Sequence, residues 1–369
     1  MRRSEPGSSM SISSSMPPAI PVLRRLRRYC QANPVDALVS VAGIIGVCTL
    51  FAMAFKWAVL DSVWLAQSMQ ECREMADGAC WAVLRERGRI VIFGLYPFEE
   101  QWRVIVACTI LLITAVCSCL SVCQRFFVIS VLWMLSLLTF TVLMNGGVLG
   151  LEPVSNAEWG GLALTFYLFA FCVIVGMPIA MGLAITRHMG PTWARVIVGS
   201  IVDLVRSIPL TAILLAMALV VPLFVPGWLA ADKLWRVAFG FTFFFACYQS
   251  EIFRGAFQSV DRGQWEGAKS LGLKPWQVQR TVILPQVFRA SLPQTVNQVV
   301  AAFKDTSYIA IVGFFDMTAS ASSALGTGAW ASAFVEVYTF VAFIYLIFGY
   351  SLSRYGAYLE NKTDLAFQR

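Results

Sequence analysis

The stretch from Gly263 to Ser270 has the residue types of a site for a nucleotide phosphate. It reads GQWEGAKS, and a phosphate-binding loop likewise carries glycines before a Lys and a Ser. That motif needs a glycine directly before the lysine, whereas Ala268 stands there, and no apolar strand precedes the stretch. The sequence therefore predicts no ATP site in this chain, and we expect neither a catalytic residue nor a resident cofactor.

Charged residues also lie within long apolar runs or at their ends. Two pairs of opposite charge are spaced three residues apart, which places each pair on one face of a helix. A charge at membrane depth costs roughly 2.5–3.5 kcal/mol on insertion scales, so it usually faces a partner or a pathway. Structural pairing near helix ends and contact with a polar substrate in a central pathway both fit this pattern. The pathway candidates are Asp203 and Arg206, Glu251 (with Arg254 beside it), and Lys304, Asp305, Thr306 and Ser307.

Two of the ten cysteines, Cys72 and Cys80, lie in a polar loop, whereas others lie in apolar runs. The residues between them include Gly78, so the chain can fold back and bring their α-carbons within the roughly 4.4–6.8 Å of a disulfide. We favour a bridge over two unpaired thiols. The cysteines show no zinc-like spacing and His188 is the only histidine, so we expect no metal site.

The chain as a whole is too apolar for a soluble protein. Of its 369 residues, 58% are hydrophobic and 13% are charged, whereas soluble domains are about a quarter charged. The uncharged runs 126–151 and 159–186 exceed the roughly 20 residues that a bilayer demands. The sequence therefore predicts an all-α, polytopic transmembrane bundle, and it excludes a soluble enzyme, a disulfide scaffold, a disordered chain and an outer-membrane barrel.

About eight spans can be placed along the chain. They follow a flexible, polar tail at 1–36, and a long polar loop at about 58–103 separates the first span from the second. The fifth span is interrupted by Pro209, and the seventh carries a polar stripe of Gln294, Asn297 and Gln298, which packing between helices explains as well as a pathway does. The spans are 37–57, 104–123, 126–146, 162–185, 196–221, 237–252, 292–313 and 331–353.

Basic residues near the ends of spans predict the orientation, because cytoplasmic segments carry the excess of Lys and Arg. This rule also accounts for the net charge of +7 without any nucleic-acid partner. With both termini inside, 18 basic residues fall inside and seven outside. The outside ones are Arg73, Arg85, Arg87, Arg89, Arg103, Lys233 and Arg236. The three arginines of 85–89 oppose the rule, but a long translocated loop follows it only weakly.

The inside loop 254–289 is too polar to span and has helical patterning of its own. Residues 264–271 suit a short helix, which Gly272 can end in the left-handed conformation. Pro275 fits the first turn of a second amphipathic helix at 276–284, and Pro285 is expected to stop or kink it. Two short helices joined at a glycine would form a compact knob, a shape suited to insertion into a partner's groove.

The spacing in this loop resembles the cytoplasmic signature of bacterial ABC-importer permeases. That signature is Glu-Ala-Ala, three residues, Gly, nine residues, Ile, one residue, Leu-Pro. The chain departs from it at Gly267 for Ala and at Val282 for Ile. The residues on this pattern are Gly263, Glu266, Gly267, Ala268, Gly272, Val282, Leu284 and Pro285.

Further motifs resemble the polar amino-acid uptake branch of these permeases. They are 206–210 (RSIPL), 248–255 (YQSEIFRG), the pair Gly263 and Gln264, and 304–307 (KDTS), and the resemblance covers about 160–360. The segments 79–81, 94–97 and 159–162 are similar to those of the general L-amino-acid permease subgroup, which extends the resemblance to nearly the whole chain.

The resemblance implies a fold, a function and a set of partners. The fold is a five-span type I importer core at 160–360, with three added spans at 37–158 and an inside tail at 361–369. The function is the permease subunit of an amino-acid ABC importer in the bacterial inner membrane. The partners are a cytoplasmic ATPase dimer, a second related permease, a periplasmic amino-acid-binding protein and the amino-acid substrate. The coupling loop 254–289 would dock on the ATPase.

Two other classes remain to be weighed. A self-sufficient secondary transporter needs inverted repeats with broken helices in matching places, and no such repeat is evident between 37–155 and 160–360. A membrane anchor or scaffold would leave the spacing of the inside loop unexplained.

Overall fold

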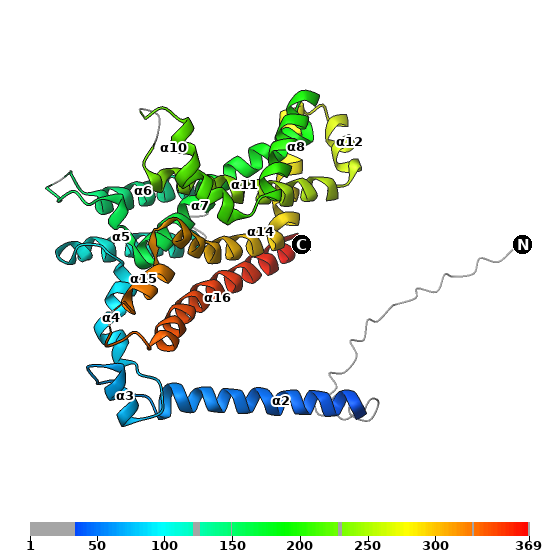
Figure 1. Ribbon diagram of the computed structural model, residues 1–369. Coiled ribbons are helices and arrows are strands. Elements are labelled where there is room, and N and C mark those ends of the chain that lie inside the picture. The colour runs from blue at the N-terminus through cyan, green and yellow to red at the C-terminus, as the bar shows by residue number, and fades with distance from the viewer. Residues whose placement is uncertain (1–33, 121–125, 149, 228–230, 327, 368–369) are drawn as a thin grey trace, which may run out of the picture. The chain divides into compact units, whose positions relative to one another are not determined.

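The computed structural model describes residues 34–120, 126–148, 150–227, 231–326 and 328–367 (Figure 1). Apart from the two-residue strand β1 (Phe315–Asp316), the regular structure within these ranges is helical, which confirms the all-α prediction. The predicted tail lies outside the described residues except for 34–36, and so do residues 121–125 around the predicted junction of the second and third spans. The chain divides into two units, 1–62 with 76–79, and 63–75 with 80–369.

The described part of the first unit is dominated by one long apolar helix. α2 (Pro34–Phe55) starts at a proline, which fits the first turn because its missing N–H would be unpaired there anyway. It runs on as a π-helical turn, Lys56–Leu60. The segment Val35–Leu60 is long and apolar enough to cross a membrane and exposes large side chains all round, as expected for a helix surrounded by lipid.

The second unit begins with short helices and two long ones. These are α3 (Met69–Met75), α4 (Ala82–Phe93), the 3₁₀ turn Phe98–Glu100, α5 (Gln101–Cys119) and α6 (Phe126–Asn145). α5 and α6 pack against each other and against α7 (Gly161–Met189). Phe140 of α6 stacks on Tyr167 of α7 at 4.8 Å, and Thr141 and Tyr167 share a hydrogen bond of 2.8 Å. The added spans α5 and α6 therefore belong to the same hydrophobic core as the region that follows them.

The rest of the second unit is built around α7. The elements after it are α8 (Thr192–Ser207), α9 (Leu210–Leu215), a π turn (Ala216–Val220), α10 (Val221–Phe224), α11 (Lys233–Ser259), α12 (Arg262–Ser270), α13 (Pro275–Gln277), a π turn (Val278–Ile283), α14 (Leu284–Asp305), a 3₁₀ turn (Thr306–Val312), β1, α15 (Met317–Ala324) and α16 (Phe334–Phe367). A short 3₁₀ turn, Asn156–Glu158, precedes α7. β1 pairs in parallel with Gly160 and Gly161, just before and at the start of α7.

α7 and α11 approach each other closely along their length. A Cβ added at Gly176 of α7 would lie 2.7 Å from a ring carbon of Phe245 of α11. Small residues let membrane helices come this near, since dispersion contacts are what hold helices together in lipid. α14 packs against α11 on one side and α16 on another, so these four helices form the frame for the site described below.

Each predicted span falls on one helix or, for the first, fifth and seventh, on consecutive helical elements, but not all are apolar enough to qualify alone. Among the described residues, five helices could cross a membrane by length and composition, or six if α8 and the helices after it form one span. That pair is bent by 102° at Pro209, the predicted interruption, because the residue before a proline is pushed out of the α conformation. α11 and α14 have 27 and 22 residues, long enough to span, but their polar side chains lower their hydropathy.

Candidate functional site

Five charged residues from three helices form one cluster, which we call the inner ionic cluster. Arg187 lies near the end of α7, Asp203 and Arg206 lie on α8, and Glu251 and Arg254 lie on α11. The Glu251 carboxylate accepts from Arg254 at 2.8 Å, lies 3.5 Å from Arg206, and pairs with Arg187. The Asp203 carboxylate lies 3.8 Å from both Arg187 and Arg206. Glu251 is therefore the centre, shared by three guanidinium groups.

Burial differs within the inner ionic cluster. The side chains of Glu251 and Arg187 are 14% and 15% exposed, whereas Asp203 is 64% exposed. The Arg206 guanidinium also lies over the ring of Tyr248, 5.3 Å from its centroid, and the Tyr248 hydroxyl donates to the Arg206 carbonyl at 3.1 Å. A half-buried carboxylate with three cations ties α7, α8 and α11 together, because removing it would leave like charges facing each other.

The two predicted pairs are present, but they are not separate. Asp203 with Arg206 and Glu251 with Arg254 each form the expected contact three residues apart. Arg187 joins them, although the sequence analysis counts it only among the 18 basic residues expected inside. It directly follows the apolar run of α7, and nothing in the local sequence indicates a partner 64 residues away.

α12 begins two residues before the predicted start and ends just before the predicted glycine. The Asp261 carboxylate accepts the Gly263 N–H at 2.6 Å and so caps the first turn. After the last turn, Gly272 has φ of +75°, and its N–H donates to the Lys269 carbonyl at 2.9 Å. The left-handed glycine ends the helix as expected, because a β-carbon disfavours that conformation.

One face of α12 is held against the C-terminal ends of α7 and α11. Ala268 is 5% exposed and packs in a hydrophobic cluster with residues of both helices. The Trp265 ring lies 5.4 Å from the ring of His188 on α7, which stacks on Phe257 of α11 at 4.9 Å. His188 is thus a packing residue between two helices and α12.

The opposite face of the loop is exposed. Glu266 and Gly267 lie on it, and Leu271 and Trp276 are 81% and 60% exposed. Arg280 lies over the Trp276 ring at 5.2 Å. An exposed carboxylate on α12 and two exposed, large apolar side chains just after it make a surface that suits a complementary groove.

The second predicted helix of the loop is not a separate element. α13 starts at Pro275 and passes through the π turn directly into α14, so Pro285 does not end the helix. The prediction of a stop there was wrong. A π turn shifts the hydrogen-bond register by one residue, and this accommodates a proline that lacks an N–H and crowds the preceding turn. Val282 and Leu284 are half-buried against the cluster below α12.

α14 carries a polar stripe along an exposed face. Gln294 and Asn297 are exposed, and so is Lys304 near the end of the helix. Asp305 is half-buried, while Thr306 is fully buried and donates to the Phe303 carbonyl at 2.8 Å. Ser307 likewise donates to the Lys304 carbonyl at 2.9 Å. Both hydroxyls are thus paired with the backbone of the preceding turn. Of residues 304–307, Lys304 is the exposed one.

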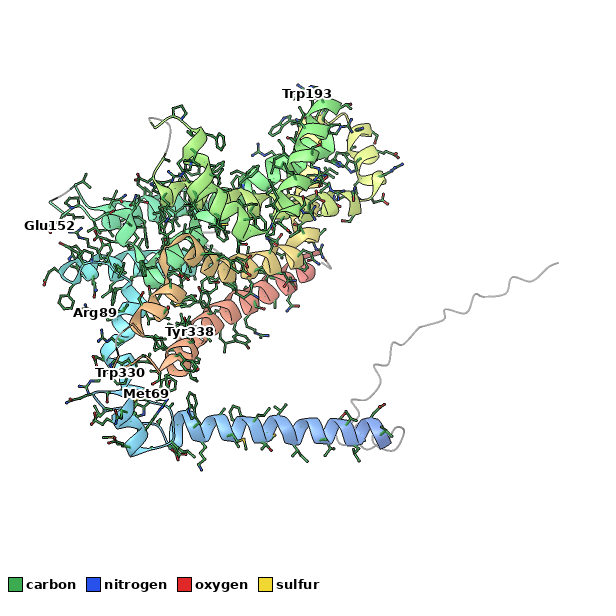
Figure 2. The ribbon with its side chains drawn as sticks, viewed as in Figure 1. Met69, Arg89, Glu152, Trp193, Trp330 and Tyr338 are labelled. Atoms are coloured by element: carbon green, nitrogen blue, oxygen red, sulfur yellow. A yellow bond between two sulfur atoms is a disulfide. The ribbon has the colours of Figure 1, made fainter. Side chains whose placement is uncertain are left out.

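Cys72 of α3 and Cys80 form a disulfide, with their α-carbons 5.9 Å apart. Further contacts hold this segment to the start of α16. The Met69 N–H donates to the Ala329 carbonyl at 2.9 Å, and the Cys80 N–H donates to the Glu336 carboxylate at 3.2 Å. Figure 2 labels Met69 and Trp330 in this region, and Trp330 donates to Glu86 of α4 at 2.9 Å. We call residues 63–75 and 80–93 the outer segment.

Comparison with known proteins bears on what this arrangement does. The family model described as the binding-protein-dependent transport system inner membrane component matches residues 176–365. The inner membrane amino-acid ABC transporter permease protein YhdY of Escherichia coli K12 is 33% identical over 328 residues, which cover 89% of each chain.

Two further relatives differ in how much of the chain they match. The glutamate/glutamine/aspartate/asparagine transport system permease protein BztC of Rhodobacter capsulatus is 29% identical over 92% of this chain and 93% of its own length. The glutamate/aspartate import permease protein GltK of Escherichia coli O6:H1 is 32% identical over 92% of its own length, but over only 55% of this chain. A shorter permease thus matches little more than half of the present chain.

Proposed function

The chain belongs to the binding-protein-dependent transport system inner membrane component family, as an amino-acid ABC transporter permease subunit with a type I importer core, and from that premise we propose which of its parts perform each step. It is a multi-pass membrane protein whose transport is powered by a separate ATPase. The alternative of a self-sufficient secondary transporter finds no support among its relatives.

We propose that α12 is the helix that docks on the ATPase. The observation that carries this is the division of α12 into two faces, one packed against α7 and α11 and the other exposed beside Leu271 and Trp276. A push on the exposed face passes directly to the ends of two membrane helices through Ala268 and Trp265. Gly263, Glu266 and Gly272 shape or line this face.

The inner ionic cluster would then pass the movement of α7 and α11 on to α8. Arg187 and Glu251 lie on the same two helices that carry α12, and their partners Asp203 and Arg206 lie on the bent α8. We infer that these charges position α8 against α7 and α11 at the inner end rather than contact the substrate. This assigns Asp203, Arg206 and Glu251 a positioning role in the transport cycle.

The polar stripe of α14 is the stronger candidate for substrate contact. Exposed amides and an ammonium group on a helix of spanning length are costly against lipid, so they are expected to face a partner or a water-filled path. We propose that Gln294, Asn297 and Lys304 face a second, related permease across the pathway. Lys304 would meet the carboxylate of the passing amino acid, with Asp305 near its ammonium group.

The remaining assignments follow from the same reading. Both termini and the loop 254–289 lie in the cytoplasm, and the outer segment lies in the periplasm, where a disulfide persists. A periplasmic binding protein delivers the amino acid, and the chain itself performs no covalent chemistry.

The test of coupling uses Gly272→Val in the full chain expressed with its partner subunits. A β-branched residue disfavours φ of +75°, so the turn after α12 should be displaced while the membrane helices fold. We expect normal membrane yield, loss of most amino-acid uptake, and less ATPase recovered with the tagged permease. Gly349→Val is the matched control, because Gly349 lies in ordinary helix on α16 with no atom near its added Cβ. Normal uptake in the Gly272 variant would refute the coupling role of this loop.

A further inference from the structure

A cavity of about 660 Å³ lies beside α4, in the outer segment, and we call it the outer groove. Its walls are mainly apolar and aromatic, with Trp64, Trp81 and Phe93 on the outer-segment side and Phe340 contributed by α16. Arg85, Gly88, Arg89 and Ile92 also line it, and their spacing places them along one face of α4. The groove thus combines an apolar interior with two guanidinium groups.

The arginines of the outer groove have no acidic partner among the described residues. Glu86 is already engaged, because it pairs with Arg87 at 3.5 Å and accepts from Trp330 at 2.9 Å. Arg89, labelled in Figure 2, lies over the ring of Phe98 at 4.1 Å and has no carboxylate partner among the described residues. Arg85 is exposed and reaches an adjoining hollow of about 540 Å³.

One acid borders that adjoining hollow besides Glu86. The Glu71 carboxylate accepts the Gln67 N–H at 2.6 Å, so it too has a local partner. The groove therefore presents net positive charge. The basic residues of 85–89 are also the ones that the charge rule for orientation leaves unexplained.

The outer groove lies at the level where two membrane spans begin. Phe98, under Arg89, is the first residue of the span Phe98–Cys119. Phe340 lies six residues into the span Phe334–Lys362, which is about 9 Å along a helix. Exposed Trp64 and Phe98 at this level fit the aromatic belt at a membrane surface. The groove thus reaches from the headgroup zone toward the acyl chains.

From these observations we propose that the outer groove binds an anionic phospholipid. Arg85 and Arg89 would hold the phosphate, since guanidinium groups match phosphate oxygens in shape and charge. The apolar walls between α4 and α16 would take an acyl chain. A soluble protein partner fits less well. To fill the groove as far as Phe340, part of that partner would have to enter below the membrane surface.

The experiment measures lipid retention on the full chain, purified with its partner subunits, by native mass spectrometry. The probes are phosphatidylglycerol and phosphatidylcholine with identical acyl chains. We expect preferential retention of phosphatidylglycerol, and a loss of about tenfold in its apparent affinity for Arg85→Gln, the size of one charge-assisted contact. Phosphatidylcholine retention should not change.

Two further variants sharpen the test. Arg73→Gln is the matched control, because Arg73 is an exposed arginine of α3 in the same segment but does not line the groove, and it should retain the lipid. Gly88→Leu should weaken binding while keeping both arginines, since its side chain would project into the groove. Equal losses for Arg73 and Arg85 would overturn the proposal, as would equal retention of the two lipids. The proposal would also be overturned if Arg85→Gln left the lipid affinity unchanged but weakened binding of the periplasmic binding protein.

Discussion

The two ends of the second unit are held together by different kinds of contact. At the inner end, α8, α7 and α11 meet through the inner ionic cluster, and α12 rests on ring stacking and a few apolar side chains. In the outer segment, a disulfide closes the loop between α3 and α4, and three hydrogen bonds to the region before α16 and its first turn, with a buried cluster around Trp330, hold α3 and α4 in place. One end is joined by exchangeable charges, whereas the other is closed on itself by a covalent bond and held by buried contacts.

This difference corresponds to what each end must do in an ABC importer permease. Charges that share one carboxylate can exchange partners while staying paired, so the helices that carry them can shift without leaving a buried ion alone. A short disulfide-closed loop and buried aromatic contacts allow no such exchange. We infer that the inner end moves during transport and that the outer segment stays fixed on the start of α16.

The largest expected effect comes from removing the shared carboxylate. Glu251→Gln keeps the shape of the side chain but leaves Arg187, Arg206 and Arg254 without their common partner. Since breaking a largely buried ion pair costs several kcal/mol, we expect uptake to fall about tenfold or more, with a smaller loss of thermal stability. Labelled amino-acid uptake and a thermal shift of the purified complex measure the two effects.

Asp203→Asn is the graded comparison within the same cluster. The Asp203 side chain is 64% exposed, so solvent screens the lost charge. The decrease in amino-acid uptake should therefore be much smaller than for Glu251→Gln. If the two variants were equally impaired, Glu251 would not be the centre of the cluster. The contrast between a mobile and a fixed end would then lose its main support.

The features that local rules govern could be predicted from the sequence. Gly272 ends α12 because glycine readily adopts the left-handed conformation. Pro209 ends α8 because proline restricts the backbone next to it. The i, i+3 charge pairs follow from helical geometry in the same way. The positions of the five helices in the described residues that are long and apolar enough to span follow from apolar runs.

Features that depend on distant parts of the chain were not predictable. Arg187 meets Glu251 only because α7 and α11 pack closely at Gly176, and no local pattern encodes that approach. Pro285 was expected to break a helix, but the π turn before it, a product of the packing of 278–283, allows the helix to continue. The outer groove likewise joins residues of α4 to Phe340 of α16.

A medium effect is expected from the outer segment. Replacing Cys72 and Cys80 together by Ser opens a short loop, which should lower stability by roughly 2–3 kcal/mol in the loop-entropy model. Uptake at moderate temperature should change little, because this segment does not move in the transport cycle. Thermal unfolding of the complex and uptake at two temperatures make the measurement.

Thiol labelling of the denatured wild-type protein accompanies this test. Under the proposed orientation, labelling of Cys72 and Cys80 should require reductant. Full labelling without it would contradict both the bridge and the placement of this loop in an oxidising compartment. A collapse of uptake in the Ser variant at all temperatures, with the protein still folded, would show that the outer segment takes part in transport.

The smallest effect concerns Gly267, where the family signature has alanine. A Cβ added there meets no atom within 4 Å, and the backbone is ordinary helix, so Gly267→Ala should stabilise α12 by about 0.5–1 kcal/mol. Hydrogen exchange of the α12 amides should slow by a factor of roughly 2–5, with uptake unchanged or slightly raised. Gly272→Ala should act in the opposite direction, because φ of +75° strains any residue with a β-carbon. A loss of uptake in Gly267→Ala despite slower exchange would mean that the ATPase approaches this backbone too closely for a methyl group. That result would place the docking contact on Gly267 itself rather than on the neighbouring Leu271 and Trp276.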